Sequence, residues 1–481
     1  MKLKELICDL PVNRIIGETD VNVDYLSCQA DKVRNNTMFF CINGTKVDGH
    51  IFAKKVMLEG VKVVVVERVL DLKGSVTQLV VSNSRIFMAL CAKNFFKCAC
   101  DKLKIIGVTG TNGKTSTTYI LKSILEESGY TVGVIGTNGV WIGNKRYATS
   151  LTTPDPIELH EWFLKMSLSD VDYVVMEVSA HALTLGKIEG IRFDIGVFTN
   201  FGRDHLDFFK TISEYEKTKR NFFNKKFCKV AVINADDVVG QKIIKENRIP
   251  VVTYGLDSPA DIFAIDVKVN NEGIGYTINL CDDVMRVKYK LKGKFNVYNT
   301  ICASSAARIL GINSEKIAQG IMRVKGIEGR AETYELKNGG RVVVDFAHTP
   351  EGFANILNYL RTTLAENGKM ICVFGCGGDR DKFKRPLMSK EVSKYCDFAI
   401  ITNDNPRYEN PKKIIADILD GISIEHDVVE DRYGAILQAV NMTKESDTLV
   451  ILGKGAENYQ EMNGRYYPFN DVEVLKKYLK Q

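Results

Sequence analysis

The sequence predicts an α/β protein of three domains, built mainly on parallel sheets that helices cover. Its 481 residues are too many for one hydrophobic core, and about three domains is the natural expectation. Apolar runs of strand length alternate with stretches of helical periodicity over most of the chain. Several of these runs are apolar at nearly every position, which is typical of parallel strands buried on both faces.

Composition narrows the class of protein. Hydrophobic residues make up 45% and charged residues 26%, as in ordinary globular proteins. The net charge of +6 is mild and no dense Lys/Arg block occurs, so we expect an anionic small substrate and no nucleic acid. The longest apolar runs are far too short for membrane insertion. The twelve cysteines lack a paired metal-binding spacing and no signal peptide follows Met1, so we expect reduced thiols in the cytoplasm. As a separate expectation, the protein is a monomer.

Residues 1–100 are expected to form a small N-terminal α/β domain. The runs 38–42 and 61–66 predict buried strands, and the stretch between them predicts a helix over 51–59. Residues 84–98 have helical periodicity and would lead into the next domain. No residue of this segment indicates chemistry by itself.

Residues 101–331 are expected to form a central domain with a mostly parallel sheet and helices on both faces. Strands are predicted at 104–109, 131–137, 173–179, 193–199 and 230–235, and helices near 115–127, 157–168 and 213–224. The stretch 260–291 alternates polar and apolar residues and predicts an antiparallel excursion. Residues 332–481 are expected to form a second doubly wound, Rossmann-like α/β domain, with strands at 341–346, 370–375, 398–403 and 448–452.

The stretch Gly110-Thr111-Asn112-Gly113-Lys114-Thr115 stands between the first central strand and its helix. Strand, glycine-rich turn and helix N-terminus together cradle phosphate, because backbone N–H groups close around the anionic oxygens. Lys114 would reach the outer phosphates, and the Thr115 hydroxyl would ligate Mg²⁺. The spacing departs from the general P-loop pattern, since Val108 stands where that pattern has a glycine. A bland loop of this composition is the alternative.

Polar residues gather where the other central strands end, at the sheet edge that binds ligands in such folds. Glu177 ends a strand and is placed to hold Mg²⁺, with a solvated carboxylate as the alternative. His205 lies between Asp204 and Asp207 and would bind metal, support a ligand or cap a turn. Lys219 belongs to a run of basic residues that indicates only a solvated helix face.

The C-terminal segment carries four polar clusters at successive strand ends: Asp345-Phe-Ala-His-Thr-Pro350, Gly375-Cys-Gly-Gly-Asp-Arg-Asp381, Asp404-Asn-Pro-Arg407 and Gly453-Lys-Gly-Ala-Glu457. A helix is expected to begin at Pro350. Arg407 would bind a carboxylate through two parallel hydrogen bonds, and Glu457 would take an ammonium group. Together the clusters predict a site for a charged, zwitterionic small molecule.

These residues resemble the motifs of a known family. Gly110–Thr115, Thr199–Asn200, Asp204–Asp207, Phe295–Asn299, Gly329–Arg330 with Glu332, and Asp345 with His348 are similar to the motifs of the Mur ligases, ATP-dependent amide-forming enzymes of peptidoglycan synthesis. Folylpolyglutamate synthetase shares the fold and some of these motifs. The third-domain clusters resemble the MurE branch, which adds the third peptide residue to UDP-N-acetylmuramoyl-L-alanyl-D-glutamate. The resemblance extends over nearly the whole chain.

The resemblance implies a role for each matching residue. ATP would be bound by Gly110, Thr111, Asn112, Gly113, Lys114, Thr115, Ser116, Asn299, Arg330 and Asp345. Mg²⁺ in two sites would be held by Thr115, Glu177, His205 and Lys219, the last as a carbamate, and Lys114, Lys219 and His205 would be catalytic. The UDP-substrate would contact Ser27, Thr152, Thr153, Ser179 and Lys187. The incoming amino acid would contact Arg380, Asp404, Asn405, Arg407, Gly453 and Glu457.

The resemblance also implies the reaction. We expect an ATP-dependent ligase that adds meso-diaminopimelate to the D-glutamate γ-carboxylate through an acyl phosphate, because Asp-Asn-Pro-Arg accompanies diaminopimelate in this branch. The alternatives are ligation of L-lysine or another diamino acid, folate polyglutamylation, and a non-catalytic paralogue that binds nucleotide or UDP-muramoyl peptide. The chain departs from the family pattern at Gln29-Ala-Asp31 in the uridine region, at Lys187, and at Ala456, where the family has histidine.

Overall fold

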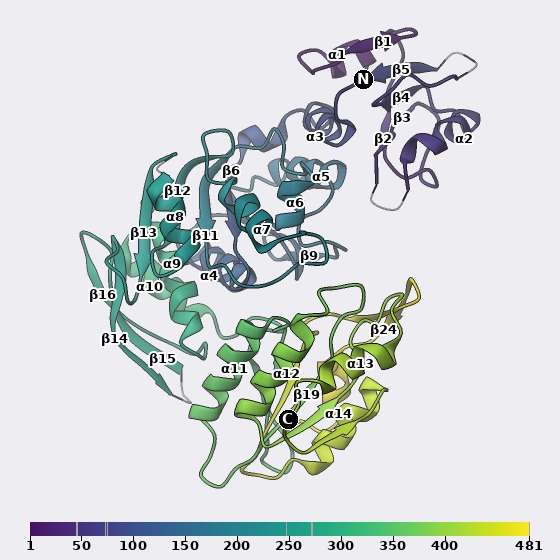
Figure 1. Cartoon of the computed structure of the whole chain (residues 1–481). Coiled ribbons are helices and arrows are strands. Elements are labelled where there is room, and N and C mark those ends of the chain that lie inside the picture. Colours follow the sequence, from purple (N-terminus) through teal and green to yellow (C-terminus); the bar gives the residue numbers. More distant parts are fainter. Residues whose placement is uncertain (45–46, 73, 75, 247, 271–272, 481) are drawn as a thin grey trace. The chain divides into compact units, whose positions relative to one another are not determined.

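The computed structural model describes residues 1–44, 47–72, 74, 76–246, 248–270 and 273–480. Within these residues the strands form sheets of five, eleven and six strands and one two-stranded hairpin (Figure 1). The predicted α/β class, with a large and mostly parallel central sheet, is confirmed. Every helix in the described part of the chain is too short or too polar to cross a bilayer.

Contacts divide the chain into two compact units. One contains residues 1–107, 130–194 and 224–229, and the other contains residues 108–129, 195–223 and 230–481. The division cuts through the strands β6 (Lys104–Thr109), β11 (Phe193–Phe198) and β12 (Cys228–Asn234). The predicted boundaries after residues 100 and 331 therefore stay predictions.

The five-stranded sheet lies in the first unit and runs β1-β5-β4-β3-β2. Its strands are β1 (Arg14–Ile16), β5 (Thr77–Val80), β4 (Val63–Val66), β3 (Thr37–Phe40) and β2 (Tyr25–Ser27), parallel except for the β1–β5 pair. The helices are α1 (Leu3–Leu6), α2 (Ala53–Leu58) after a 3-10 turn at Gly49–Phe52, and α3 (Ser84–Phe95). The two predicted strands and both predicted helices are present, whereas β1, β2 and β5 had not been predicted.

The valine run of β4 shows why continuous apolar sequence forms a central strand. Successive side chains of a strand point to opposite faces. Val63 and Val65 accordingly pack into one core, beside Phe87 of α3, while Val64 and Val66 pack into the other, beside Val56 of α2. Both faces are buried, so both sets of positions must be apolar.

The eleven-stranded sheet runs β16-β15-β14-β13-β12-β11-β6-β10-β7-β8-β9. Besides the strands above it contains β7 (Val132–Gly136), β8 (Gly139–Ile142), β9 (Lys145–Tyr147), β10 (Tyr173–Glu177), β13 (Val251–Gly255), β14 (Ile262–Asn270), β15 (Gly273–Asn279) and β16 (Val284–Tyr289). The five predicted strands are present. The predicted antiparallel excursion is confirmed as β14–β15–β16, apart from residues 271 and 272, which lie outside the described residues.

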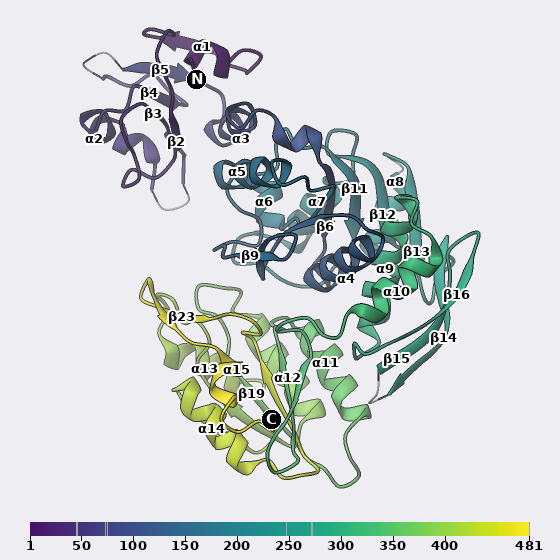
Figure 2. The ribbon, with the colours of Figure 1, turned by 180° about the vertical axis from the view of Figure 1, so that it is seen from behind.

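The helices between these strands are α4 (Lys114–Glu127), α5 (Pro156–Ser167), α6 (Ala180–Thr184), α7 (Ile212–Arg220), α8 (Val238–Glu246), α9 (Phe295–Ile309) and α10 (Ser314–Arg323). Helix α4 packs against α9 and α10, as seen from behind in Figure 2. Gly320 of α10 permits this approach, because a Cβ there would lie 2.4 Å from Cα of Ile124. This packing fixes the helix that follows the glycine-rich loop.

The six-stranded sheet runs β17-β18-β22-β19-β20-β21. Its strands are β17 (Glu332–Glu335), β18 (Arg341–Asp345), β19 (Met370–Phe374), β20 (Phe398–Ile401), β21 (His426–Val428) and β22 (Thr448–Leu452). Its helices are α11 (Pro350–Thr362), α12 (Lys384–Tyr395), α13 (Pro411–Leu419), α14 (Arg432–Met442) and α15 (Asp471–Leu475), and the hairpin is β23 (Tyr459–Met462) with β24 (Arg465–Pro468). The four predicted strands and the helix start at Pro350 are confirmed.

The strand order of this sheet brings the four predicted polar clusters together. Strands β18, β22, β19 and β20 are neighbours and run parallel. Their carboxyl ends therefore meet at one edge, where the sequence of each strand gives way to a polar cluster. Cores on the two faces of the sheet hold this edge in place, one against α11, α12 and α13 and the other against α14 and α15.

Candidate functional site

The glycine-rich loop turns sharply between β6 and α4. Gly110 and Gly113 have φ angles of +151° and +84°, which L side chains rarely adopt. A Cβ on Gly110 would lie 1.9 Å from Oγ1 of Thr199, and one on Gly113 would lie 2.5 Å from Oδ1 of Asn299. Both glycines are therefore required by the backbone and by the close approach of polar side chains, as in a loop that encloses an anion.

The end of β11 holds this loop. The backbone N–H of Asn112 donates to Oδ1 of Asn200 at 2.9 Å, and Oγ1 of Thr199 donates to the Asn112 carbonyl at 2.6 Å. The backbone N–H of Thr111 donates to the Asn200 carbonyl at 2.9 Å. The predicted motifs Gly110–Thr115 and Thr199–Asn200 thus form one structure.

Lys114 and Thr115 begin helix α4, and Ser116 is buried in its first turn. The Lys114 ammonium donates to the carbonyl oxygens of Gly110 and Thr111, at 3.0 and 2.9 Å. The Thr115 hydroxyl accepts a hydrogen bond from Nη2 of Arg330 at 2.9 Å. Two predicted nucleotide-binding residues that are far apart in sequence are therefore in direct contact.

Lys219 differs from the solvated residue that its charge run had indicated. It lies on α7 and is 1% exposed, whereas Lys217 two positions earlier is exposed. Its ammonium donates to the carbonyl of Gly110 at 2.8 Å. Burial, together with the charge of Lys114, holds the pKa of Lys219 well below its ordinary value. The prediction of a solvated face was wrong at this position, because successive helical residues point in different directions.

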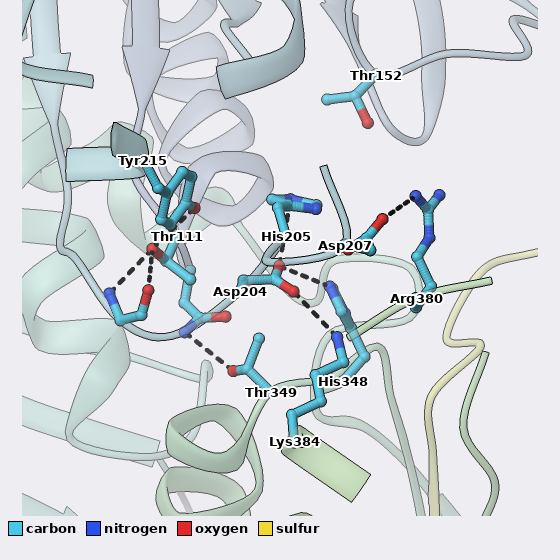
Figure 3. A network of polar contacts seen from close by, with 12 residues as sticks. Thr111, Thr152, Asp204, His205, Asp207, Tyr215, His348, Thr349, Arg380 and Lys384 are labelled. Atoms are coloured by element: carbon cyan, nitrogen blue, oxygen red, sulfur yellow. Dashed lines mark hydrogen bonds and ion pairs between the residues drawn. The ribbon is translucent and has the colours of Figure 1, made fainter. Parts of the chain in front are cut away.

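Asp204 lies at the centre of the network in Figure 3. One carboxylate oxygen is 3.0 Å from Nζ of Lys384, and the other lies 3.2 Å from Nε2 of His205 and 3.5 Å from Nε2 of His348. Burial alone would raise the pKa of Asp204, but Lys384 and the two histidines outweigh it and hold the pKa well below the usual range. His205 itself has φ of +56°, so the backbone is held in an uncommon conformation here.

Two further ion pairs join the 203–207 segment to the loop that follows β19. Arg380 pairs with Asp207 (Figure 3), with 3.2 Å between the two charged groups, and Arg203 lies 3.2 Å from Asp381. Asn112 also donates to the Thr349 hydroxyl at 3.3 Å. The structure thus places the predicted amino-acid ligand Arg380 beside the segment that carries His205.

Asn299 and Asp345 were predicted to contact nucleotide. Asn299 is buried in α9 and donates to Oδ1 of Asn296 at 2.9 Å. Asp345 ends β18 and accepts backbone N–H groups of Ala331 and Ala347, each at 2.6 Å. Burial raises the pKa of Asp345, although Arg330 and these two N–H groups oppose the shift. Arg330 stacks over the Phe346 ring at 4.3 Å, between these residues and Thr115.

The edge formed by β22 and β20 holds the predicted amino-acid ligands. Asn405 donates to the Glu457 carboxylate at 2.9 Å, and a Cβ on Gly453 would lie 2.6 Å from Oδ2 of Asp404. Lys454, which had been given no role, is fully buried among them. Its ammonium lies 3.1 Å from Oδ1 of Asn405, 3.0 Å from Glu457 and 3.7 Å from Asp404.

Arg407 lies in the loop after β20, two residues beyond Asn405, and its side chain is one-fifth exposed. Its Nε lies 3.1 Å from the Glu461 carboxylate, and its Nη1 donates to the carbonyl of Gly378 at 2.8 Å. Within the described residues no hydrogen bond engages its Nη2. Neither Glu461, which lies in β23, nor Lys454 had been predicted, because a single charged residue gives no periodic signal.

The predicted UDP-substrate residues of the first unit also gather at a strand end. Glu177 ends β10 and accepts the backbone N–H and hydroxyl of Thr137, at 2.9 and 3.1 Å. The Thr152 hydroxyl is 3.1 Å from that of Thr137. Thr153 donates to the Glu177 carbonyl at 2.9 Å and accepts the backbone N–H of Ser179 at 3.1 Å.

Lys187 joins this cluster to a pocket that contains Gln29, Ala30 and Asp31, the stretch that the resemblance had assigned to the uridine region. It lies 2.8 Å from Asp155 and donates to the Thr153 carbonyl at 3.4 Å. Asp155 also lines a pocket of about 520 Å³, which is completed by Cys28, Gln29, Ala30, Asp31, Ile42, Gly44, Val47, Gly49, Phe52, Lys55, Arg85 and Met88. Ser27 lies beside it and holds the turn at Gln29 through hydrogen bonds of 2.9 and 3.0 Å. The lining comes from separate segments of the chain, of which the sequence had indicated only residues 29–31.

The chemistry of the predicted metal ligands differs from residue to residue. Among the described residues, no three His, Cys, Asp or Glu side chains are grouped to hold an ion. Mg²⁺ at phosphate-transfer sites commonly takes one or two protein oxygens and completes its shell with phosphate and water. The Thr115 hydroxyl and the Glu177 carboxylate offer oxygen, whereas Lys219 offers nitrogen and would become an oxygen ligand only as a carbamate.

Comparison with known proteins decides the family. Residues 108–307 match the family model described as Mur ligase middle domain, and residues 329–455 match the one described as Mur ligase, glutamate ligase domain. A UDP-N-acetylmuramoyl-L-alanyl-D-glutamate–2,6-diaminopimelate ligase of Clostridium acetobutylicum is 42% identical over 100% of both chains. The chain belongs to the Mur ligase family. The ligase of the same name from Clostridioides difficile is 40% identical over 100% of this chain and 99% of its own.

Solved structures agree with this assignment. A structure of a UDP-N-acetylmuramoyl-L-alanyl-D-glutamate–2,6-diaminopimelate ligase matches with a TM-score of 0.69 at 29% identity, covering 99% of this chain and 98% of its own. A Mycobacterium tuberculosis folylpolyglutamate synthase matches with a TM-score of 0.65 at 16% identity, covering 76% and 92%. The second likeness concerns the fold alone. The predicted resemblance to Mur ligases is thus confirmed, whereas the roles of individual site residues stay predictions.

Proposed function

We propose that this Mur ligase uses ATP to join meso-diaminopimelate to the D-glutamate γ-carboxylate of UDP-N-acetylmuramoyl-L-alanyl-D-glutamate. The products are the amide, ADP and phosphate, and the reaction is a step of peptidoglycan biosynthesis. The observation that carries the proposal is similarity at 37–42% identity, over at least 97% of the chain, to relatives that bear the name of this ligase. The alternatives of folate polyglutamylation and simple binding have no comparable support.

ATP binds at the loop 110–116 in this proposal. The positive φ angles of Gly110 and Gly113 turn the backbone toward the N-terminus of α4, and Lys114 is placed to exchange its two carbonyl partners for phosphate oxygens. Asn299 lies against Gly113 and is placed beside the base. Arg330 and Asp345 approach from the start of the C-terminal sheet. Arg330 already contacts the hydroxyl of Thr115.

Mg²⁺ accompanies the nucleotide, in two sites held by Thr115, Glu177, His205 and Lys219. When bound, the ions offset the negative charge that develops as phosphate is transferred. Lys219 serves as an N-carboxylated lysine, which is an anionic oxygen ligand where an ammonium would repel a cation. Support comes from its burial and low pKa, since the uncharged amine is the form that reacts with carbon dioxide.

The two organic substrates bind at different strand ends. Thr152, Thr153, Ser179 and Lys187 contact the muramoyl-dipeptide, and the pocket beside Ser27 accepts the UDP end. The diamino acid binds at Arg380, Asp404, Asn405, Arg407, Gly453 and Glu457. Meso-diaminopimelate has a distal carboxylate for Arg407 and a distal ammonium for Glu457, whereas lysine has no distal carboxylate.

The chemistry follows from this placement. The γ-carboxylate attacks the terminal phosphate of ATP, forming an acyl phosphate and releasing ADP. The amine of diaminopimelate then attacks the acyl carbon, and phosphate leaves the tetrahedral intermediate. Lys114 stabilises the charge on the transferred phosphate. The C-terminal residues hold the amine within reach of the acyl carbon, which supplies the gain from positioning.

A direct assay tests the proposal. Purified protein with ATP, Mg²⁺ and UDP-N-acetylmuramoyl-L-alanyl-D-glutamate is given meso-diaminopimelate, L-lysine or L-ornithine, and the product is followed by mass. We expect product with diaminopimelate and little with the other two. Arg407→Lys keeps the charge but loses the planar fork, so it should reduce the preference for diaminopimelate. Faster turnover of lysine by the wild-type protein would refute the specificity, and no product with any amino acid would refute the ligase activity.

We also propose that the chain works as a cytoplasmic monomer. Analytical ultracentrifugation at assay concentrations should give a single species near 53.9 kDa.

A further inference from the structure

We propose that Arg385 and Glu409 are positioning residues for the amino-acid site: their buried ion pair ties the loop after β19 to the loop after β20 and so fixes the guanidinium of Arg407. This inference rests on the proposed function, because it concerns how the diamino acid is held. Neither residue reaches the substrate edge itself. They act through the two loops, defined here as the β19 loop (375–381) and the β20 loop (404–409).

The two loops touch along their backbones. The N–H of Gly378 donates to the Asn405 carbonyl at 2.9 Å, and the Tyr408 N–H donates to the Asp379 carboxylate at 3.2 Å. A Cβ on Gly378 would lie 1.9 Å from the Pro406 carbonyl oxygen. The approach leaves no room for a side chain, so the register of one loop on the other is narrowly defined.

The ion pair lies behind this contact. Arg385 donates to the two oxygens of Glu409 at 2.9 and 2.7 Å, to Asp417 at 2.7 Å and to the Gly377 carbonyl at 3.1 Å. The same Glu409 carboxylate accepts the backbone N–H of Asp379 at 3.0 Å. Arg385 therefore binds both loops, and Glu409 of the β20 loop binds the backbone of the β19 loop. The Arg385 side chain is wholly buried.

Arg407 needs such support. Its φ is +52°, and that of Asp379 across the loop contact is +51°, so each loop contains a non-glycine residue in the left-handed region. Such residues persist only where their surroundings hold them. Glu409 stands two positions after Arg407 and anchors the turn that contains it. Glu409 also binds the backbone of Asp379, and the neighbouring Gly378 carbonyl accepts a hydrogen bond from Nη1 of Arg407 at 2.8 Å.

This arrangement leaves one part of the guanidinium without a hydrogen bond among the described residues. Nε is taken by Glu461 and Nη1 by Gly378, so the edge with Nη2 remains for an incoming carboxylate. A bidentate contact depends on the orientation of the fork as much as on its charge. Loosening the turn would therefore weaken carboxylate binding without removing any group that the substrate touches.

The alternative is that the pair only stabilises the domain, as buried ion pairs often do. The chain offers a matched control in Arg432 and Asp471. Their side chains are both fully buried, whereas that of Glu409 is 9% exposed, and they too form a bidentate pair, at 2.8 and 2.7 Å. Within the described residues the Asp471 carboxylate bonds to Arg432 and to neither loop. Arg432 itself donates to the carbonyls of Leu452 and Asn403, at 3.0 and 3.5 Å, so this pair lies near the same edge but does not hold the β19 loop.

The test compares Glu409→Gln with Asp471→Asn in the full-length ligase. Both changes remove one buried charge and keep the side-chain size. We expect Glu409→Gln to raise KM for meso-diaminopimelate about tenfold, with kcat and the KM values for ATP and the UDP-substrate changed by less than about threefold. Glu409→Asp restores the charge and should recover part of the affinity. Asp471→Asn should lower thermal stability at least as much as Glu409→Gln does, and should raise KM for diaminopimelate by less than about threefold.

A second readout does not depend on turnover. The Nε–Hε NMR signal of Arg407, assigned through Arg407→Lys, should move toward the position of a mobile arginine in Glu409→Gln and stay in place in Asp471→Asn. An unchanged signal with an unchanged KM in Glu409→Gln would overturn the positioning role. If the wild-type protein forms no product, the proposed function fails, and the Arg407 signal alone then decides whether the ion pair orients the guanidinium.

Discussion

The glycine at the start of α4 offers a sharp test of the nucleotide site. In Gly113→Ala the new Cβ would lie 2.5 Å from Oδ1 of Asn299, a contact that real Cβ atoms essentially never make. The residue would also have to keep a φ of +84°. Asn299 or the loop must therefore move, and both belong to the proposed ATP site.

Gly129, just beyond the other end of the same helix, allows the cost of the left-handed backbone to be measured apart from the displacement of Asn299. Its φ is +89°, and a Cβ there would meet nothing within 4 Å. Both substitutions cost about 1–2 kcal/mol for the left-handed backbone. Gly113→Ala adds the displacement of the Asn299 amide. If that displacement costs another ~1.4 kcal/mol of binding free energy, the Kd for ATP rises about tenfold in this variant alone.

Calorimetric titration with ATP and Mg²⁺, beside thermal unfolding of both variants, measures these quantities. We expect the two variants to lose similar amounts of stability. The Kd for ATP should rise in Gly113→Ala and should stay within about twofold of wild type in Gly129→Ala. Equal ATP affinity in the two variants would refute the placement of nucleotide at this loop. A Gly113→Ala protein too unstable to titrate is replaced by Asn299→Ala, which removes the crowding partner and should weaken ATP binding directly.

Two further predictions concern buried charges. Lys219→Ala should abolish ligation, and added small carboxylates should restore part of the activity. Lys217→Ala, on the exposed face of α7, should leave the ligation rate unchanged. A wild-type rate in Lys219→Ala would remove Lys219 from the mechanism. The Arg385 guanidinium lowers the pKa of Glu409 from 4.5 to about 2, so its stabilising effect is present above the unfolded pKa and is lost as pH falls through the folded one. The difference in Tm between wild type and Glu409→Gln should therefore be full at pH 7 and shrink below about pH 4.5, and a difference that grows on acidification would contradict this reasoning.

Much of the architecture could be predicted because it follows from local pattern. Strands such as β4 and β19 are buried on both faces, so their sequences are continuously apolar and stand out. Strands β1 and β2 do not stand out in the sequence. They are three-residue strands at the two edges of their sheet, with mostly exposed or half-buried side chains and little periodicity. The loop at Gly110 was evident because its backbone requires glycine.

Other features depend on contacts between distant segments. Lys219 looks like one of several surface lysines until the fold buries it against Gly110. The pocket beside Ser27 is lined by short segments that are distant in sequence. Arg385 and Glu409 are 24 positions apart and form their ion pair only in the folded domain. In each case the chemical character of a residue comes from its surroundings, which single-sequence pattern does not contain.

Lys454 bears on the charge balance of the proposed amino-acid site. It is fully buried, and its positive charge faces the carboxylates of Asp404 and Glu457. These three groups together carry a net charge of −1, and uncompensated charge is costly to bury. In the proposed function, the distal ammonium of diaminopimelate would supply the missing positive charge. We therefore expect an analogue that lacks the distal amine to bind more weakly.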